Sequence, residues 1–579
     1  MYKANKGHLQ PLLISNVNDL PEKHRKRLEQ SWAGTFYQET FCRIPEDLFR
    51  VLYADLPSRP NVPVNVLVSL DLLKAQFGWS DEELFDHFVF DMQVRYAVGL
   101  RDLKEGDFEI RTLYYFRRHL ADHFLKTGEN LLQIAFEQMT DQQACTHKVN
   151  LRVQRMDSTQ IMSNIVDASR LQLLVEVIQR LVRVLSVAEQ ERYAELLAPY
   201  VEKSAHQFIY PVKGKQAWES RLAEIGQVMY RLVTELAAAY EHEPIYQVFK
   251  RIFEDNYQVE AQTVRALDNK EIPSGCLQSV DDLEATYRKK GPKGFKGYVA
   301  NLSESCSPDN ELQLITQLQV APNNQDDADL LADSLLELKA RTGVESLYVD
   351  GGYGSPEVDE VCIDQKVEVV QTGIRGNAPD PEKLNLSNFE IKQDERGKPV
   401  QMTCPGGQTV TVEPGRSTGY IVHFDPEKCQ KCPFFQENRC RAQGGKKDPR
   451  PKLSFTQQEV NWARRRRRHE TFKKEDGNPR AAVEASIRSL KHPFPNGKLP
   501  VRGLFRVTCM LIGSAAMINM KRIHRYLGEK DKPGGGKQGA KKAQKAADQL
   551  PLDSILAVIK TRLEALWLLS RPVCTCFGF

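Results

Sequence analysis

The sequence predicts a multidomain α/β protein whose centre is a mixed sheet flanked by helices, with a helical N-terminal domain, a helical insertion and a β-rich insertion. Three observations predict this fold class. Apolar residues recur at helical spacing in residues 1–150, strand-like alternation separated by one helix follows in residues 151–380, and short alternating runs punctuated by Gly and Pro fill residues 381–459. A chain of 579 residues is too long for one hydrophobic core, so several domains are expected.

The N-terminal segment is expected to be a compact helical domain. An apolar helix over Val66–Phe77 ends at Gly78, and Ser80 with Glu83 forms a capping box for the next helix. A third helix, Ile110–Leu125, carries arginines and several aromatic residues. Two interpretations fit this basic face: a DNA-binding domain, or a packing domain whose arginines are solvated.

The segment that follows is expected to form the first part of the α/β core. Leu151–Met156 alternates like a strand and ends on Asp157, whereas helical spacing from Ala168 to Glu260 indicates a helical insertion over about residues 167–270. Strands separated by a single helix then resume, which is typical of a mixed α/β sheet. The expected elements are strands at Gly297–Leu302, Leu312–Val320, Glu345–Val349 and Val367–Thr372, and a helix at Asp326–Ala340.

The C-terminal third of the chain is expected to contain three different segments. Residues 381–459 form the small β-rich insertion, with a strand at Tyr420–Phe424. Residues 460–527 return to helical spacing and complete the core. Residues 528–579 begin with a basic, Gly-rich flexible linker and end with an amphipathic helix at Leu552–Leu569.

The segment Asn478–Lys491 is expected to be a helix with one charged face. Asn478 can cap this helix, and Pro479 suits the first helical position, where no N–H donor is needed. At about 100° per residue the apolar positions share a face toward a core: Val483, Ile487 and Leu490. A second, narrow face carries one acid and three cations: Arg480, Glu484, Arg488 and Lys491. Such a face suits a metal ion beside a phosphate backbone.

Asp157 and Asp350 occupy similar places, because each follows an apolar alternating strand and precedes a small polar turn. A carboxylate at the end of a strand projects from a rigid sheet, which places a catalytic group accurately. Each residue could equally start a turn or cap a helix, as Asp often does. With Glu484 as a third acid, we expect the three carboxylates to converge through tertiary folding.

At these acids the chain resembles a known family. Asp157 after a strand, Asp350 in Asp-Gly-Gly-Tyr and Glu484 in Arg-x3-Glu-x6-Lys resemble the DDE transposases of bacterial insertion sequences. More narrowly, the chain resembles the cut-and-paste superfamily with a Tyr-Arg-Glu-Lys signature, although the tyrosine of that signature is here Gly477. The resemblance covers roughly residues 35–527 and implies an RNase H-like core with an insertion between the second acid and the glutamate.

The resemblance also implies the chemistry: a DNA transposase that binds element ends, cleaves phosphodiesters and joins 3′-OH ends to target DNA. Asp157, Asp350 and Glu484 would hold two Mg²⁺ ions roughly 3.5–4 Å apart for in-line transfer, and Mn²⁺ can substitute. Cations of the same helix would grip phosphates: Arg480, Arg488 and Lys491. The implied partner is double-stranded DNA, both terminal repeats and target, bound by a homodimer. The alternatives are a catalytically silent DNA-binding protein derived from a transposase, and an RNase H-like nuclease without strand transfer.

Four cysteines are clustered within the β-rich insertion. Cys404, Cys429, Cys432 and Cys440 have the spacing C-x24-C-x2-C-x7-C. Four thiolates without a catalytic neighbour suit a closed tetrahedral Zn²⁺ site that stabilises a small domain. Buried, redox-inert thiols are the alternative, and the spacing also permits an iron–sulfur site.

Basic residues are concentrated locally, although the net charge is only +4. Five consecutive arginines are expected either to contact DNA or to form a solvated helical face: Arg464, Arg465, Arg466, Arg467 and Arg468. The N-terminus has no apolar signal region, and no run of about 18 apolar residues occurs. We therefore expect a cytoplasmic protein without a membrane partner. The resemblance implies that it is bacterial and nucleoid-associated.

Overall fold

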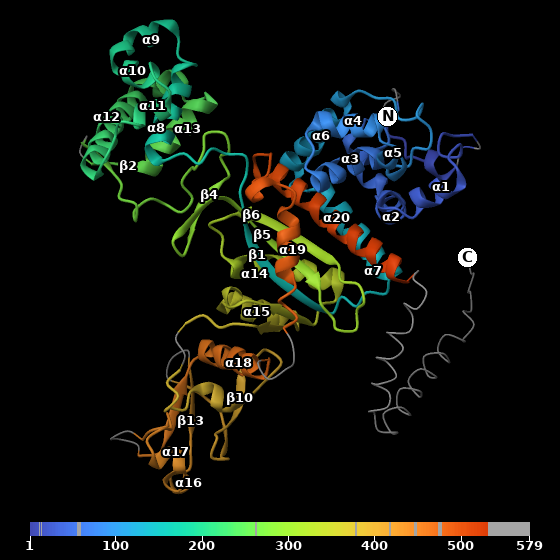
Figure 1. Ribbon diagram of the computed structural model, residues 1–579. Helices are drawn as coiled ribbons and strands as arrows, with labels where there is room; N and C mark the ends of the chain where they lie inside the picture. The colour runs from blue at the N-terminus through green and yellow to red at the C-terminus, as the bar shows by residue number, and fades with distance from the viewer. Residues whose placement is uncertain are drawn as a thin grey trace, which may run out of the picture. The chain divides into compact units, whose positions relative to one another are not determined.

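The structure is a computed structural model, shown in Figure 1, and it describes residues 1–530 with short gaps. The gaps are residues 11, 13, 55–59, 261–262, 377–378, 416–418, 445–448 and 473–477. The chain divides into two compact units, Met1–Lys521 and Arg522–Phe579. Most of the expected basic linker, and all of the expected helix at Leu552–Leu569, lie outside the described residues.

The N-terminal segment folds into helices around one hydrophobic core. Helix α3 (Val64–Phe77) ends at Gly78 in the left-handed conformation, with φ 71°, and α4 (Asp81–Phe90) begins with the Ser80–Glu83 capping box, as predicted. The remaining elements are η1 (Gly7–Leu9), α1 (Glu22–Glu29), α2 (Trp32–Glu39), η2 (Phe41–Arg43), η3 (Glu46–Leu52), α5 (Met92–Ala97), α6 (Ile110–Thr127) and α7 (Leu131–Thr146).

Helix α20 (Leu504–Lys530) is long and apolar enough to cross a membrane, judged by length and composition alone. Within the described part of the chain it is the one helix that meets this test. Its most apolar window is 61% buried, and Val507, Leu511 and Ala515 belong to the same core as the N-terminal helices. These contacts make α20 a core helix of the fold.

In the described part of the chain, a six-stranded mixed sheet forms the centre. The strand order is β4-β5-β1-β7-β8, and β6 pairs with β5. Strand β1 is antiparallel to β5 and parallel to β7, which is itself parallel to β8. This arrangement is compatible with an RNase H-like core. The strands are β1 (Val153–Ile161), β4 (Thr286–Lys290), β5 (Lys293–Ser305), β6 (Ile315–Pro322), β7 (Ser346–Val349) and β8 (Glu368–Gln371).

Helices cover both faces of this sheet. On one face, α14 (Asp327–Thr342) and α15 (Pro356–Asp364) form a core with Met156 and Val349 of the strands. On the other face, α19 (Val483–Lys491) and α20 join a core that includes Leu302 and Leu318. Because side chains alternate along a strand, neighbouring residues contribute to opposite cores.

Between β1 and β4 the chain forms a helical insertion, as predicted, with its own hydrophobic core. Leu174, Ile178, Leu232 and Phe249 are fully buried there. The elements are α8 (Arg170–Val182), α9 (Val187–Arg192), α10 (Ala194–Val201), α11 (Ala205–Ile209), α12 (Lys215–Tyr240), α13 (Pro244–Asn256) and a hairpin of β2 (Tyr257–Glu260) and β3 (Thr263–Ala266).

After β8 the described residues form short strands in two three-stranded sheets, as the alternating pattern predicts. Phe389, Met402 and Val422 lie in their shared core, and α18 (Gln457–Phe472) packs onto it through Val460. The other elements are η5 (Leu386–Asn388), β9 (Glu390–Gln393), β10 (Pro399–Thr403), β11 (Thr409–Thr411), β12 (Glu413–Pro414), β13 (Tyr420–His423), α16 (Pro426–Gln430), α17 (Pro433–Gln436) and β14 (Lys452–Phe455).

Strand β1 differs from its prediction, because it does not end at Asp157. The strand continues to Ile161, and every residue from Gln154 onward pairs with β5. The small polar residues after Asp157 were expected to form a turn. The long partner strand β5 supplies backbone hydrogen bonds that keep them extended instead.

The start of α19 also differs from its prediction. The helix begins at Val483 rather than at Asn478. The Asn478 side chain accepts the backbone N–H of Arg480 at 3.0 Å, and the Asn478 carbonyl accepts that of Ala481. Asn478 therefore closes a turn that precedes the helix, which is a common alternative to helix capping for this residue type.

Candidate active site

The two aspartates that the sequence analysis pairs lie at the same level, Asp157 on β1 and Asp350 directly after the neighbouring parallel strand β7. The register of β1 and β7 places Asp157 at the level of Asp350, the residue that follows β7. Met156 belongs to the core beneath α14 and α15. Asp157 comes one residue later, so its side chain points to the face that α19 covers.

Asp350 is held by the turn after β7. Its Oδ1 accepts the backbone N–H of Gly352 at 2.6 Å and so caps η4 (Gly351–Tyr353). A Cβ on Gly352 would lie 2.7 Å from this oxygen and 2.9 Å from Oδ2 of Asp327. Glycine is therefore the residue that lets both carboxylates approach this backbone.

Asp327, which the sequence analysis did not single out, is part of this acidic cluster. It is the first residue of α14, it is buried, and its Oδ1 accepts a hydrogen bond from Ser158 Oγ at 2.7 Å. Arg375 Nη2 lies 3.9 Å from its Oδ2. One signal in the sequence could have revealed it: at helical spacing Asp327 shares the buried face of α14 with Leu331 and Leu338, where a carboxylate is unusual.

Tyr353 is buried beside these acids, with no solvent exposure. Its O–H donates to Asn301 Oδ1 at 2.8 Å. Burial raises the pKa of the Tyr353 phenol well above its ordinary value, and the charges of Asp327, Asp157 and Asp350 raise it further. Negative charge is thus concentrated around one buried point of the fold.

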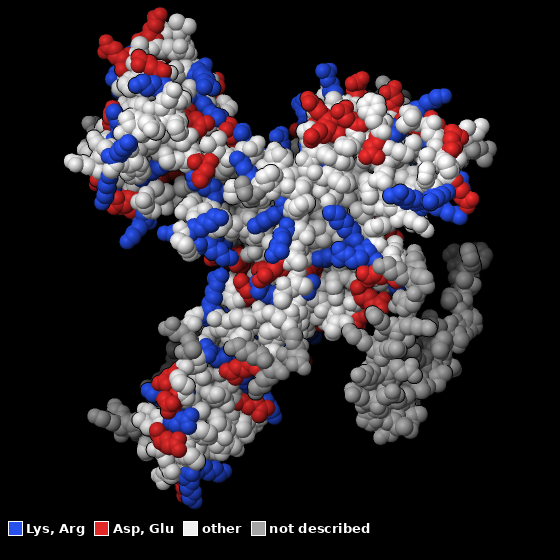
Figure 2. All heavy atoms as spheres, in the orientation of Figure 1, with Lys and Arg blue, Asp and Glu red and all other residues white. Residues whose placement is uncertain are grey.

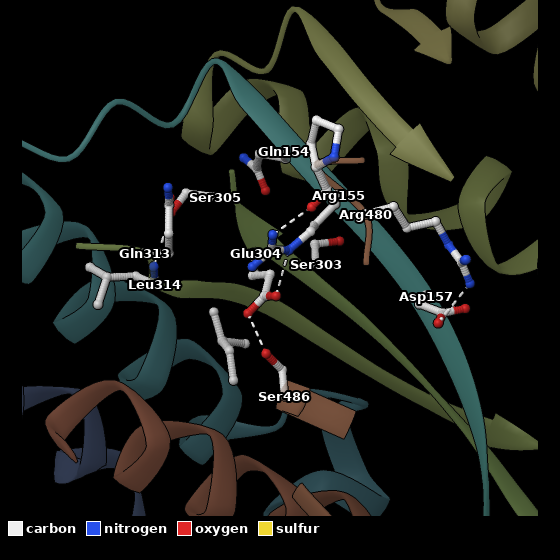
Figure 3. A network of polar contacts seen from close by, with 12 residues as sticks. Gln154, Arg155, Asp157, Ser303, Glu304, Ser305, Gln313, Leu314, Arg480 and Ser486 are labelled. Atoms are coloured by element: carbon white, nitrogen blue, oxygen red, sulfur yellow. Dashed lines mark hydrogen bonds and ion pairs between the residues drawn. The ribbon is translucent and has the colours of Figure 1, made fainter. Parts of the chain in front are cut away.

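Arg480 is the cation that the structure places against Asp157. Its Nη2 lies 2.9 Å from Asp157 Oδ2, as Figure 3 shows. Burial raises the pKa of the Asp157 carboxyl, the Arg480 charge opposes that rise, and the Asp350 charge adds to it. Arg480 therefore offsets part of the negative charge that the cluster accumulates.

A buried ion pair fixes the segment that carries Arg480 against the sheet. Glu304 of β5 is fully buried and accepts from Arg155 Nε at 2.6 Å and from Ser486 Oγ of α19 at 2.7 Å (Figure 3). Arg155 also donates to the carbonyl of Pro479 at 2.5 Å. These contacts tie α19 and the turn before it to both central strands.

Helix α19 presents a charged face outward, as the sequence predicts. Its buried positions are Val483, Ser486 and Leu490. Glu484 and Arg488 are exposed, and Glu484 forms no ion pair with any described residue. The structure therefore brings Asp157 and Asp350 together with Arg480, and it leaves Glu484 on the exposed side of the same segment.

The arginine run lies in α18. Three of its members pair with acids of α15 and β8: Arg464 and Arg465 lie 3.6 and 3.5 Å from Asp359, and Arg468 lies 2.9 Å from Glu368. Arg466 and Arg467 have no ion-pair partner among the described residues, and Arg466 stacks on Trp462 at 4.2 Å. Part of the run thus attaches α18 to the core, and its contact with DNA stays a prediction.

The clustered cysteines come together within the β-rich insertion: Cys404, Cys429, Cys432 and Cys440. Gln408 bridges two of them, because its backbone N–H donates to Cys404 Sγ and its Nε2 to Cys429 Sγ, each at 3.4 Å. A Cβ on Gly406 would lie 3.0 Å from Cys432 Sγ and 3.7 Å from Cys404 Sγ. Burial raises the pKa of the Cys429 and Cys440 thiols, and the neighbouring thiols add to that rise.

Neither the acids nor the cysteines form a complete ligand shell. Among the residues that the structure describes, no group of three or more His, Cys, Asp or Glu side chains is placed so that it could hold a metal ion. The donors fit metals by their chemistry, since carboxylate oxygens suit Mg²⁺ and four thiols suit Zn²⁺. At the acids, Arg480 occupies one oxygen of Asp157, Oδ2.

Comparison with known families gives a match to the C-terminal part of the chain. Residues 403–524 match the family model described as Transposase DDE domain. The match supports a DDE transposase family. The matched stretch contains the cysteine cluster, α18 and α19 with Glu484, whereas Asp157 and Asp350 precede it. No curated protein and no solved structure matches the chain.

Proposed function

We propose that the chain is the transposase of a bacterial insertion sequence, which cleaves phosphodiesters at the element's ends and joins the 3′-OH ends to target DNA. One observation carries this proposal: Asp157 of β1 lies level with Asp350, the residue after the adjacent parallel strand β7, and Asp157 faces a helix of the matched transposase domain. The partner is double-stranded DNA, and a homodimer would bridge two ends.

The proposed roles follow from the contacts. Asp157, Asp350 and Glu484 would hold Mg²⁺, which when bound activates the attacking oxygen and stabilises the leaving one. The pairing of β1 with β7 fixes the positions of the two aspartates relative to each other. The hydrogen bond from Ser486 to Glu304 keeps α19 against the sheet. Arg480 offsets the charge of Asp157 and can turn to a DNA phosphate, which a guanidinium binds through two parallel hydrogen bonds.

The proposal is tested by cleavage followed by joining. The full-length protein is incubated with Mg²⁺, a target plasmid and a duplex carrying the inverted repeats that flank its open reading frame. Cleaved 3′ ends covalently joined to the plasmid are the expected product. Cleavage without joining would indicate an RNase H-like nuclease, and binding without cleavage in Mg²⁺ or Mn²⁺ would indicate a silent DNA-binding protein.

Asp327→Asn is expected to raise the Mg²⁺ concentration that cleavage requires, because its carboxylate lies beside that of Asp350 and supports the same cluster. Loss of a group that supports metal ligands typically costs about 10–100-fold in metal affinity or activity. A Mg²⁺ titration of the cleavage rate measures this. Asp329→Asn, at an exposed position two residues later, is the matched control. A Mg²⁺ dependence equal to that of the wild type would exclude Asp327 from the site.

We also propose that the four clustered cysteines bind one structural Zn²⁺. Four sulfurs in one small domain, two of them accepting hydrogen bonds from Gln408, support a thiolate site. Cys429→Ser is expected to remove the bound zinc, about one ion per chain, and to lower the thermal stability of the insertion. Elemental analysis and calorimetry measure both effects.

Cys145→Ser provides the control for this prediction, since Cys145 is exposed and lies in α7, outside the cluster. It should keep its zinc and its melting behaviour. Wild-type protein that contains no zinc, and whose unfolding a chelator does not change, would contradict the proposal.

A further inference from the structure

The part of β5 that pairs with β4 forms, with β4, a hairpin that carries only positive charge. From Thr286 to Gly297 the sequence contains five Lys or Arg residues and no Asp or Glu. Lys290 and Lys293 are a cross-strand pair at the tip of the hairpin, and both are exposed. Like charges directly opposite each other destabilise a strand pair, so this arrangement indicates a function that requires both charges.

The base of the hairpin is neutralised, and its tip is not. Arg288 lies 2.9 Å from Asp326, and Lys296 lies 3.0 Å from Asp167. Lys290 and Lys293 have no acidic partner within ion-pair distance among the described residues. The unneutralised charge therefore lies at the end of the hairpin that is farthest from its anchoring contacts.

Helix α19 adds a third lysine to this tip. The side chain of Lys491, the last residue of α19, lies over η6 (Pro495–Gly497), where a Cβ on Gly497 would be 3.2 Å from Lys491 Cδ. Burial lowers the pKa of Lys491, and the charges of Lys293 and Lys290 lower it further. Lys498, directly after η6, forms a backbone bridge with Met162, and a Cβ on Gly297 of β5 would lie 3.4 Å from Met162 Cα. The C-terminal end of the helix that carries Glu484 therefore lies beside the β4–β5 hairpin. We call Lys290, Lys293 and Lys491 the lysine cluster.

The lysine cluster lies a few base pairs' length from Glu484, one of the acids of the proposed site. Seven residues of α19 separate Glu484 from Lys491, which at 1.5 Å per residue is about 10 Å, the length of roughly three base pairs of a DNA duplex. Figure 2 shows Lys and Arg side chains on the face where Figure 1 places β4 and α19. A cation cluster that far from Glu484 would meet phosphates close to the scissile one.

We propose that the tip of the β4–β5 hairpin and the end of α19 form a clamp for the phosphodiester backbone of the duplex that enters the acidic site. The inference rests on the proposed function and adds a DNA contact from a segment just after the helical insertion. Phosphates relieve the repulsion among the three ammonium groups, which no protein acid among the described residues offsets. The contact is independent of base sequence, because backbone phosphates carry no sequence information directly.

The test is the salt dependence of DNA binding by the full-length protein carrying Lys290→Ala and Lys293→Ala together. The probe is a short, fluorescently labelled duplex of mixed sequence, titrated at several salt concentrations. Each lost phosphate contact reduces the slope of log K against log salt by about 0.9, so the double variant should lose about 1.8 and bind roughly 10–100-fold more weakly at 0.1 M salt.

Lys203→Ala with Lys213→Ala removes the same charge from exposed positions of the helical insertion and should leave slope and affinity unchanged. A hairpin variant with the slope and affinity of the wild type would overturn the clamp, as would an equal loss in the control. The two proposals fail separately: a wild-type protein that binds DNA without cutting it would refute the proposed function, while the difference in slope would still establish the clamp.

Discussion

Asp350→Asn is expected to reduce DNA cleavage at least about 10³-fold while DNA binding is retained. The substitution keeps the size of the side chain and removes the charge that a metal ion requires. Loss of metal-assisted stabilisation is worth several kcal/mol, and each 1.36 kcal/mol corresponds to a tenfold change in rate. Cleavage of end-bearing DNA and its binding are measured on the same preparations. Asp157→Asn and Glu484→Gln should behave alike.

Asp364→Asn is the matched control, because Asp364 is exposed at the end of α15. It removes the same charge outside the acidic cluster and should cleave like the wild type. Full cleavage by Asp350→Asn, Asp157→Asn or Glu484→Gln would remove that residue from the site.

Glu304→Ala is expected to destabilise the core by about 3–5 kcal/mol, because it leaves the buried Arg155 guanidinium without its partner. It also removes the acceptor for Ser486, so α19 loses its tie to β5 and cleavage should fall. Since 1 kcal/mol shifts the melting temperature of a domain of 150–250 residues by about 2–4 °C, the calorimetric transition of the core should move down by roughly 10 °C.

Glu311→Ala provides the comparison, since Glu311 is exposed between β5 and β6. This variant should melt at the temperature of the wild type. Replacing both members of the pair, as Arg155→Met with Glu304→Leu, should recover much of the lost stability, because no buried charge is left unpaired. If Glu304→Ala melted at the wild-type temperature, the pair would not hold the core together.

Local patterns in the sequence predicted most of the elements. Gly78 ends α3 and the Ser80–Glu83 capping box starts α4, because such signals act over one helical turn. Strand β7 and Asp350 after it were also predicted, since the strand is short and apolar and ends in a Gly-Gly turn.

Features that depend on distant partners escaped the sequence analysis. Strand β1 runs through Asp157 because β5, on the far side of the helical insertion, pairs with it. Asp327 lies beside the other acids only because tertiary folding brings Ser158 of β1 and the turn at Gly352, after β7, to the start of α14. Glu304 gives no signal in the sequence that distinguishes it from an exposed strand residue.

The functional assignment came from motif spacing rather than from periodicity. The acids and the spacing around Glu484 led to the DDE transposases, and the family match over residues 403–524 supports that family. Helical periodicity correctly assigned Glu484 to the exposed face of its helix. It could not show that Arg480, placed on the same face, turns inward to Asp157, because a turn rather than a helix precedes Val483.

The most direct measurement is cleavage of the polypeptide by hydroxyl radicals generated at the metal. Fe²⁺ replaces Mg²⁺ in the full-length protein bound to DNA, and peroxide with ascorbate produces radicals that cut the chain next to the ion. We predict three cuts, near Asp157, Asp350 and Glu484, all suppressed by excess Mg²⁺ and lost in Asp350→Asn. Cuts near only one of these residues, or cuts elsewhere that Mg²⁺ suppresses, would contradict a shared metal site.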